Sequence, residues 1–218
     1  MSNNTVELIG LYGSDETHAL SAWTSTSRDL TQDKKDRIPA LLKMLAENGH
    51  ETPFEKSSIH FLITCDVASH IHLLKHRIGV SVNAESARYK ELKDDKYYVP
   101  NDWDDEEQKL YVQHLENSLQ QYHSALDRLV KKGVSRKRAK ESARFYLPYG
   151  NQITSDIMFN FRSFVHFLRL RYSQHAQVEI REIAGQMLQL VVDTGAFNST
   201  LSAFGLVNDG GGIILPFN

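Results

Sequence analysis

The sequence predicts a mixed α/β fold (α+β) that is rich in helix and contains one small sheet. Apolar residues recur at helical spacing in several stretches, of which residues 37–48 are the first clear one. Only residues 59–65 alternate between two faces as a strand does. The chain has no internal repeat, no low-complexity segment and no Pro/Ser-rich linker, so we expect a single domain over residues 1–218.

The elements of the first half follow from local patterns. A helix is expected over residues 37–48, because its apolar residues share one face and Gly49 can form the C-cap. After a turn, every second residue from Ile59 to Cys65 is apolar, which indicates a strand with one face against a core. A short helix through residues 71–75 is expected to follow this strand.

The second half is predicted to be helical. A long amphipathic helix is expected from near Asp104 to Gly133, and Ser135 can cap a further helix that stops before Pro148. Another helix is indicated by apolar residues at helical spacing from Ile157 to Leu168, and a last one by those at 176–193.

Composition excludes several classes of protein. With 25 Lys and Arg against 27 Asp and Glu, the 218-residue chain has a formal net charge of −2. The protein therefore lacks the overall positive potential that would attract it to nucleic acid or an anionic membrane. The single cysteine, Cys65, excludes an intrachain disulfide and a CxxC metal or redox site. No apolar run is long enough to span a membrane and the start of the chain does not look like a signal peptide, so a cytoplasmic protein is expected.

One short segment carries an unusual density of polar groups. It contains Lys75, His76 and Arg77, followed within fifteen residues by Ser81, Asn83, Glu85, Ser86, Arg88 and Tyr89. One guanidinium group can bind two phosphate oxygens at once, so this segment suits an anionic nucleotide. P-loop, GxGxxG, GxSxG and HExxH motifs are all missing from the sequence, and no metal site is expected.

This segment resembles the signature of flavin-dependent thymidylate synthases. His76-Arg77 is followed after eight residues by Ser86-Ala87-Arg88-Tyr89, as in that family. Four more segments are similar and stand in the family order, so that the resemblance spans about residues 20–190. They are the segments 49–55, 142–148, 160–171 and 175–180.

The resemblance implies a fold, an assembly and a reaction. The fold would be the helix-rich α/β fold of this family, in a homotetramer whose active sites are shared between subunits. The reaction would be the methylation of dUMP to dTMP, with FAD as the flavin, NADPH as the reductant and 5,10-methylenetetrahydrofolate as the carbon donor. The cysteine of classical thymidylate synthases would have no part in it, since Cys65 lies on the apolar face of the predicted strand.

The resemblance also implies roles for single residues. Arg171 would stabilise negative charge on the uracil ring, and Ser86, which has no adjacent base to activate it, would bind and orient the nucleotide. The residues expected to hold dUMP are His72, Lys75, Glu85, Ser86, Ala87, Arg88, Arg144 and Arg171. Those expected to hold FAD are Ser25, Thr52, Glu55, Lys75, His76, Arg77, Asn83, Asn160, Arg162, His166 and His175.

The chain departs from the family pattern at four positions. Lys75 stands where the signature has Arg. Lysine keeps the positive charge but lacks the planar guanidinium group that can bind two oxygens at once. His72 stands where Gln is common, Ala84 where Glu is usual, and Trp23 where a basic residue often precedes Ser25. These changes leave open a flavin- or nucleotide-binding relic without methylation activity. A helical RNA-binding or regulatory protein is the other alternative, against which the balanced charge counts.

Overall fold

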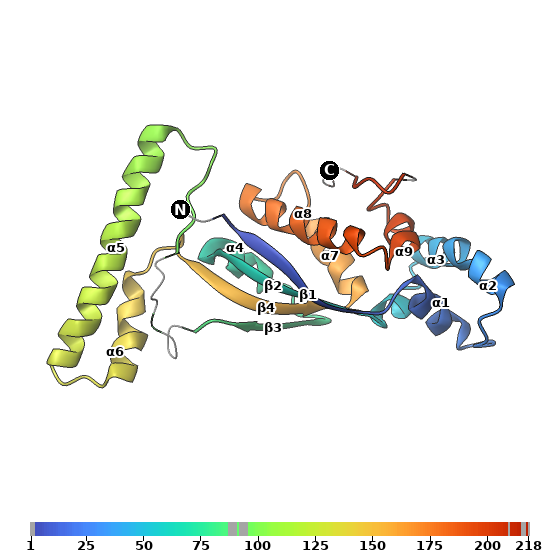
Figure 1. Cartoon of the computed structure of the whole chain (residues 1–218), viewed down its shortest axis with the longest axis horizontal. Helices are drawn as coiled ribbons and strands as arrows, with labels where there is room; N and C mark the ends of the chain where they lie inside the picture. The colour runs from blue at the N-terminus through green and yellow to red at the C-terminus, as the bar shows by residue number, and fades with distance from the viewer. Residues whose placement is uncertain (1–2, 87–90, 92–95, 209, 215–216, 218) are drawn as a thin grey trace. The chain divides into compact units, whose positions relative to one another are not determined.

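The computed structural model describes residues 3–86, 91, 96–208, 210–214 and 217. The described chain is helix-rich α+β and contains a four-stranded sheet in the order β1-β2-β4-β3 (Figure 1). The backbone N–H of Asn160 bonds to the carbonyl of Gly79, and that of Glu85 to the carbonyl of Thr154, so β3 and β4 run antiparallel. The strands are β1 (Thr5–Tyr12), β2 (Ser58–Asp66), β3 (Val80–Ala84) and β4 (Gln152–Phe159).

The alternation predicted for residues 59–65 is confirmed by β2. Ile59, Phe61, Ile63 and Cys65 are fully buried, while the residues between them are partly exposed. One face of β2 therefore packs against the core, as an amphipathic strand does. The sheet is larger than the sequence analysis expected, because β1, β3 and β4 were not predicted.

Contacts divide the chain into two units, each built from segments that are discontinuous in the sequence. The first unit contains residues 1–5, 63–75 and 83–155. The second contains residues 6–62, 76–82 and 156–218. The expectation of a single domain over residues 1–218 stays a prediction.

The first unit contains a helical hairpin. Its long arm, α5 (Asp105–Lys131), is capped by Asp104 and confirms the predicted amphipathic helix, and α6 (Arg136–Ala143) is capped by Ser135 as expected. The two helices lie side by side and enclose a small apolar cluster around Tyr122 and Leu126 (Figure 1). The unit also holds η2 (Arg144–Tyr146), a single 3₁₀ turn, and α4 (Val67–Leu73), which begins and ends before the predicted 71–75 helix does.

The second unit is held together by an aromatic core. Phe54, Phe161, Phe164 and Phe197 are fully buried, and their rings pack mostly edge-to-face or tilted. The helices expected at 37–48 and 176–193 are confirmed as α3 and α8. The helical elements of this unit are α1 (Asp15–Trp23), α2 (Gln32–Asp36), α3 (Ile38–Glu47), η1 (Thr52–Glu55), α7 (Phe161–Arg171), α8 (Val178–Asp193) and α9 (Asn198–Ala203).

The helix predicted from Ile157 to Leu168 begins later than expected. Ile157 lies in β4 and not in a helix, where it is buried together with Ser155 and Phe159 on every second position. The spacing of four between Ile157 and Phe161 fits a helix by coincidence, but pairing with neighbouring strands decides the backbone. The helix α7 starts only after Asn160.

Candidate active site

The N-terminus of α7 is fixed by Asn160, one of the residues expected to hold FAD. Its side-chain oxygen accepts a hydrogen bond from the backbone N–H of Ser163 at 2.8 Å, so Asn160 is the N-cap. Its own backbone N–H donates to the carbonyl of Gly79 at 3.0 Å. The Ser163 hydroxyl donates to the carbonyl of Ile78 at 2.7 Å. The segment that follows His76 and Arg77 is thereby tied to the first turn of α7.

This contact requires glycine at position 79. Gly79 has φ of +65°, in the left-handed region that favours glycine. A Cβ placed there would lie 2.3 Å from the Ser163 hydroxyl oxygen and 2.4 Å from the Asn160 side-chain nitrogen. The absence of a side chain therefore lets the backbone approach the helix cap.

Further along α7, His76 lies against the helix. Its ring is buried and packs edge-on against Phe167, at 5.0 Å between centroids, and against His166 at 5.9 Å. The Nε of Arg171 donates a hydrogen bond to Nε2 of His76 at 3.1 Å. Arg171 is half-buried, and this burial lowers the pKa of its guanidinium from the usual range. Three residues predicted for the site, His76, His166 and Arg171, are thus brought together.

Arg162 forms a second group with two carboxylates. Its Nε contacts Glu51 and its Nη1 contacts Glu55, each at 2.6 Å, which raises the pKa of the guanidinium. The group Glu51–Arg162–Glu55 has a formal charge of −1, so Arg162 adds no net positive charge here. The sequence analysis named Arg162 and Glu55 but missed Glu51, because nothing in its local spacing shows a contact with α7.

The remaining flavin candidates of the second unit are exposed. Thr52 opens η1, His175 follows α7, and Ser25 bonds through its hydroxyl to the carbonyl of Ala22 in the turn after α1. Arg77 is exposed and makes no hydrogen bond or ion pair with a described residue. Its charge is therefore available to an anion.

The candidates in the first unit lie on three elements. Asn83 is exposed on β3, and the carboxylate of Glu85, just after β3, accepts a hydrogen bond from the backbone N–H of Thr154 at 3.0 Å. Ser86 is partly buried, His72 lies at the end of α4, and Lys75 follows it. Arg144 opens η2 and is exposed. Ala87 and Arg88 lie outside the described residues.

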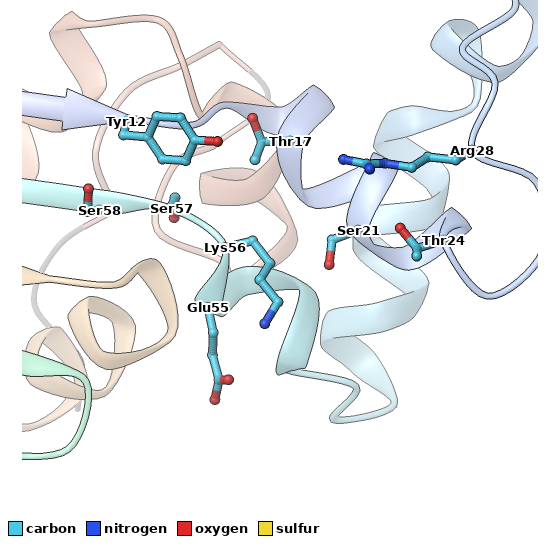
Figure 2. Close-up of a pocket in the computed structure, with 9 residues that line it drawn as sticks. All are labelled: Tyr12, Thr17, Ser21, Thr24, Arg28, Glu55, Lys56, Ser57 and Ser58. Atoms are coloured by element: carbon cyan, nitrogen blue, oxygen red, sulfur yellow. The ribbon is translucent and has the colours of Figure 1, made fainter.

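A pocket of about 590 Å³ opens in the second unit beside Glu55 (Figure 2). Its charged residues are Arg28, Glu55 and Lys56, and in Figure 2 the Arg28 side chain extends toward Thr17 and Ser21 on α1. The hydroxyl groups that line it belong to Tyr12, Thr17, Ser21, Thr24, Ser57 and Ser58. The sequence analysis did not find Arg28 or Lys56, because an isolated basic residue among polar neighbours is ordinarily interpreted as a surface charge.

The thiol of Cys65 is unsuited to nucleophilic chemistry. It is fully buried in β2, and burial, with a smaller contribution from the neighbouring charge of Asp66, raises the pKa of the thiol well above its usual range. The expectation that Cys65 is a structural residue agrees with this environment. Among the described side chains, no group of three or more His, Cys, Asp or Glu residues could hold a metal ion.

Comparison with known proteins identifies the family. Residues 7–194 match the family model described as thymidylate synthase complementing protein. The chain belongs to the flavin-dependent thymidylate synthase family. Relatives with this name include those of Pseudothermotoga lettingae, 32% identical with 85% of this chain and 83% of the relative covered, and Thermosipho melanesiensis, 34% identical with 82% and 81% covered. The family name implies a flavin cofactor.

Solved structures of similar fold agree with this family assignment. A UMP/dUMP methylase, PolB from Streptomyces cacaoi, crystallised with 5-Br dUMP, has a TM-score of 0.78 and 27% identity to this chain. The match covers 94% of this chain and 96% of that one. In the described part of this family member, no helix is long and apolar enough to cross a membrane.

Proposed function

We propose that this protein methylates dUMP to dTMP, with 5,10-methylenetetrahydrofolate as the carbon donor and NADPH as the reductant acting through FAD. The observation that carries the proposal is the family match over residues 7–194. The similarity to a methylase crystallised with a brominated dUMP supports a pyrimidine nucleotide as the substrate.

The positively charged candidates support binding of an anionic nucleotide. Lys75 and Arg144 are exposed, and the side chain of neither makes a hydrogen bond or ion pair with a described residue. A guanidinium that no carboxylate neutralises can bind two phosphate oxygens at once, so we assign Arg144 to the phosphate of dUMP. We assign Arg88 to the same phosphate on the family resemblance alone.

Arg171 suits the charge that develops during the reaction. Addition of hydride to the uracil ring moves negative charge toward a ring carbonyl, which a fixed guanidinium stabilises without giving up a proton. The hydrogen bond to His76 holds Arg171 from one side, at its Nε, and leaves the two terminal nitrogens for the ring. We therefore assign charge stabilisation to Arg171 and orientation of the nucleotide to Ser86.

The residues around α7 fit a flavin dinucleotide in their chemistry. Arg77 offers a charge for the diphosphate, while the carboxylates of Glu51 and Glu55, oriented by Arg162, can accept hydrogen bonds from hydroxyl groups. When bound, the flavin supplies the electrons of the methylation. The residues Ser25, Thr52, Asn83, Asn160, His166 and His175 complete the proposed flavin contacts.

A homotetramer with shared active sites is part of this proposal. Phe145 and Tyr146 follow Arg144 directly and Tyr149 lies five positions after it, and their exposed fractions are 83%, 47% and 68%. Large apolar side chains gathered beside a proposed phosphate ligand support coverage by a second subunit. We place the enzyme in the cytoplasm, where a reducing environment keeps a lone thiol such as Cys65 free.

The test is product formation by the purified protein. With FAD, NADPH, methylenetetrahydrofolate and dUMP, chromatography should detect dTMP, and omission of the folate should abolish it. A parallel reaction with UMP tests whether the chain accepts the ribonucleotide, as the name of the Streptomyces methylase suggests for that enzyme. Flavin-containing protein that forms no methylated nucleotide from either substrate would show a binding relic and not a synthase.

A further inference from the structure

The last turn of α7 carries Arg171, the residue assigned to charge stabilisation. Arg171 ends the helix and Tyr172 is its C-cap. The final carbonyl groups of a helix have no partner inside it, so the last turn frays where nothing else binds them. A fixed position for the Arg171 side chain therefore requires that the chain just beyond the helix is anchored.

Phe217 provides this anchor through its backbone. Its N–H donates a hydrogen bond to the carbonyl of Tyr172 at 2.8 Å, and its carbonyl accepts one from the N–H of Gln174 at 2.9 Å. The two bonds make Ser173 and Phe217 a parallel bridge, the pairing of neighbouring parallel strands. Phe217 is thus paired with the loop that begins directly after Arg171.

Ser173, at the centre of this bridge, extends the anchored region toward His175. Ser173 is buried, and its hydroxyl oxygen accepts a hydrogen bond from the backbone N–H of His175 at 3.3 Å. Its carbonyl accepts another from the N–H of Ala176 at 3.0 Å. The loop is therefore a tight turn whose position depends on the strand that pairs with Ser173.

A glycine-rich turn reverses the chain before it reaches Phe217. Val207, which is buried, and Ile213 form an antiparallel bridge at the base of this turn. The side-chain oxygen of Asn208 accepts hydrogen bonds from the N–H groups of Gly210 at 3.0 Å and Gly212 at 2.9 Å. These contacts give the otherwise unexplained Gly-rich stretch a structural purpose, since they anchor the chain that leads to Phe217.

We propose that Phe217 is a positioning residue of the active site, whose backbone holds the end of α7 so that Arg171 stays hydrogen-bonded to His76. The inference rests on the role proposed for Arg171 in the methylation. It goes beyond the family assignment, because the family model matches residues 7–194 and Phe217 lies outside them.

The contact between Arg171 and His76 is sensitive to small movements of the helix end. The Nε of Arg171 lies 3.1 Å from Nε2 of His76. An increase of about 0.5 Å takes this distance beyond the range of a hydrogen bond. Loss of the pairing with Phe217 should therefore release the guanidinium without removing it.

Phe217→Pro tests the proposal, because proline has no N–H to donate to Tyr172. At saturating FAD, the rate of dTMP formation should fall by about tenfold, since the guanidinium is misplaced but still present. Phe217→Ala keeps the backbone N–H and carbonyl, and should restore the rate to within about threefold of wild type. A rate in Phe217→Pro equal to that in Phe217→Ala would overturn the proposal.

A double-mutant cycle separates positioning from general damage. If Phe217 acts through Arg171, adding Phe217→Pro to Arg171→Ala should lower the remaining rate by less than about twofold. A tenfold fall in both backgrounds would show a structural effect that does not involve Arg171, and would contradict the proposal.

NMR of the flavin-free protein gives a measurement that needs no turnover. The hydrogen bond to His76 should slow exchange of the Arg171 Nε–H with water, and Phe217→Pro should raise this exchange rate by about tenfold while Phe217→Ala does not. The Nε–H of Arg162, which is bound to Glu51 at the other end of α7, is the matched control and should not change.

A deletion of residues 215–218 replaces Phe217→Pro if that variant does not fold, because it removes Phe217 without introducing proline. Unchanged exchange of the Arg171 Nε–H in the folded variant would overturn the proposal. A protein that forms no dTMP but shows the faster exchange would refute the proposed function and leave the positioning of Arg171 by Phe217 supported.

Discussion

Arg171 donates a hydrogen bond from Nε to Nε2 of His76, at 3.1 Å, across 95 positions of sequence. Because arginine cannot accept a hydrogen bond, Nε2 of His76 must carry a lone pair, so His76 is neutral in this contact. The guanidinium is thus held through its Nε, and neither terminal nitrogen has a hydrogen-bond partner among the described residues. This geometry gives the central test of the proposed mechanism.

Arg171→Ala should lower the rate of dTMP formation by about a hundredfold or more, comparable to the loss of an oxyanion-stabilising donor. Reduction of the flavin by NADPH need not change, because it precedes the charge on the uracil ring. Arg171→Lys should recover only part of the rate, since lysine lacks the planar fork. Arg169→Ala, which removes a neighbouring exposed charge on α7, is the control. Normal dUMP binding and turnover in folded Arg171→Ala would make Arg171 a structural residue.

Arg77→Ala should weaken FAD binding by about tenfold, because the variant removes a charge that no described residue neutralises. Flavin fluorescence during titration of the flavin-free protein measures the affinity. Arg37→Ala removes an exposed arginine that is paired with Asp33 and should leave the affinity unchanged. Equal affinities in wild type and Arg77→Ala would refute the assignment of Arg77 to the flavin diphosphate.

Gly79→Ala should destabilise the protein by about 2–4 kcal/mol, the sum of a left-handed backbone cost and the overlap with Ser163 and Asn160. Gly133→Ala is the matched control, because Gly133 also has a positive φ, +86°, but no atom lies within 4 Å of the added Cβ. That variant should cost only about 1 kcal/mol. Urea denaturation measures the free energy of unfolding of both variants. Equal losses of stability would show that the backbone at position 79 can shift away from α7 to make room for the added Cβ.

Stability should fall as the pH drops from about 6.5 to about 4. The pKa of His18 is lowered to about 4 by burial, so in this window the unfolded chain holds a proton at His18 that the folded chain does not. The contribution is complete above pH 6.5 and amounts to about 3 kcal/mol lost by pH 4. His18→Gln should remove this part of the pH dependence. An NMR titration in which His18 protonates near pH 6.5 in the folded protein would contradict the prediction.

Cys65→Ala should keep the rate of dTMP formation within about threefold of wild type, because a buried strand thiol is replaceable by a small apolar group. The cost in stability should be about 1 kcal/mol, from the lost sulfur contacts. Native protein should also react slowly with iodoacetamide until it is unfolded, since the thiol is inaccessible and its pKa is raised. Abolished turnover in folded Cys65→Ala would instead indicate a cysteine mechanism.

The sequence by itself determined the elements whose signal is local. The long helix α5, the helix α8 and the strand β2 repeat their apolar residues with a fixed period, and Asp104 and Ser135 mark helix starts within three residues of the N–H groups they cap. The family also followed from the sequence, because its motifs are contiguous and stand in order.

Only the tertiary structure decided which of these residues meet. Whether Ile157 is in a strand or a helix depends on pairing with β2 and β3, which the spacing to Phe161 does not reveal. The hydrogen bond between His18 in α1 and Thr200 in α9 spans 182 positions. A period along one helix or strand reports local backbone geometry, whereas a hydrogen bond across the fold depends on how whole elements pack, and no short stretch of sequence records that.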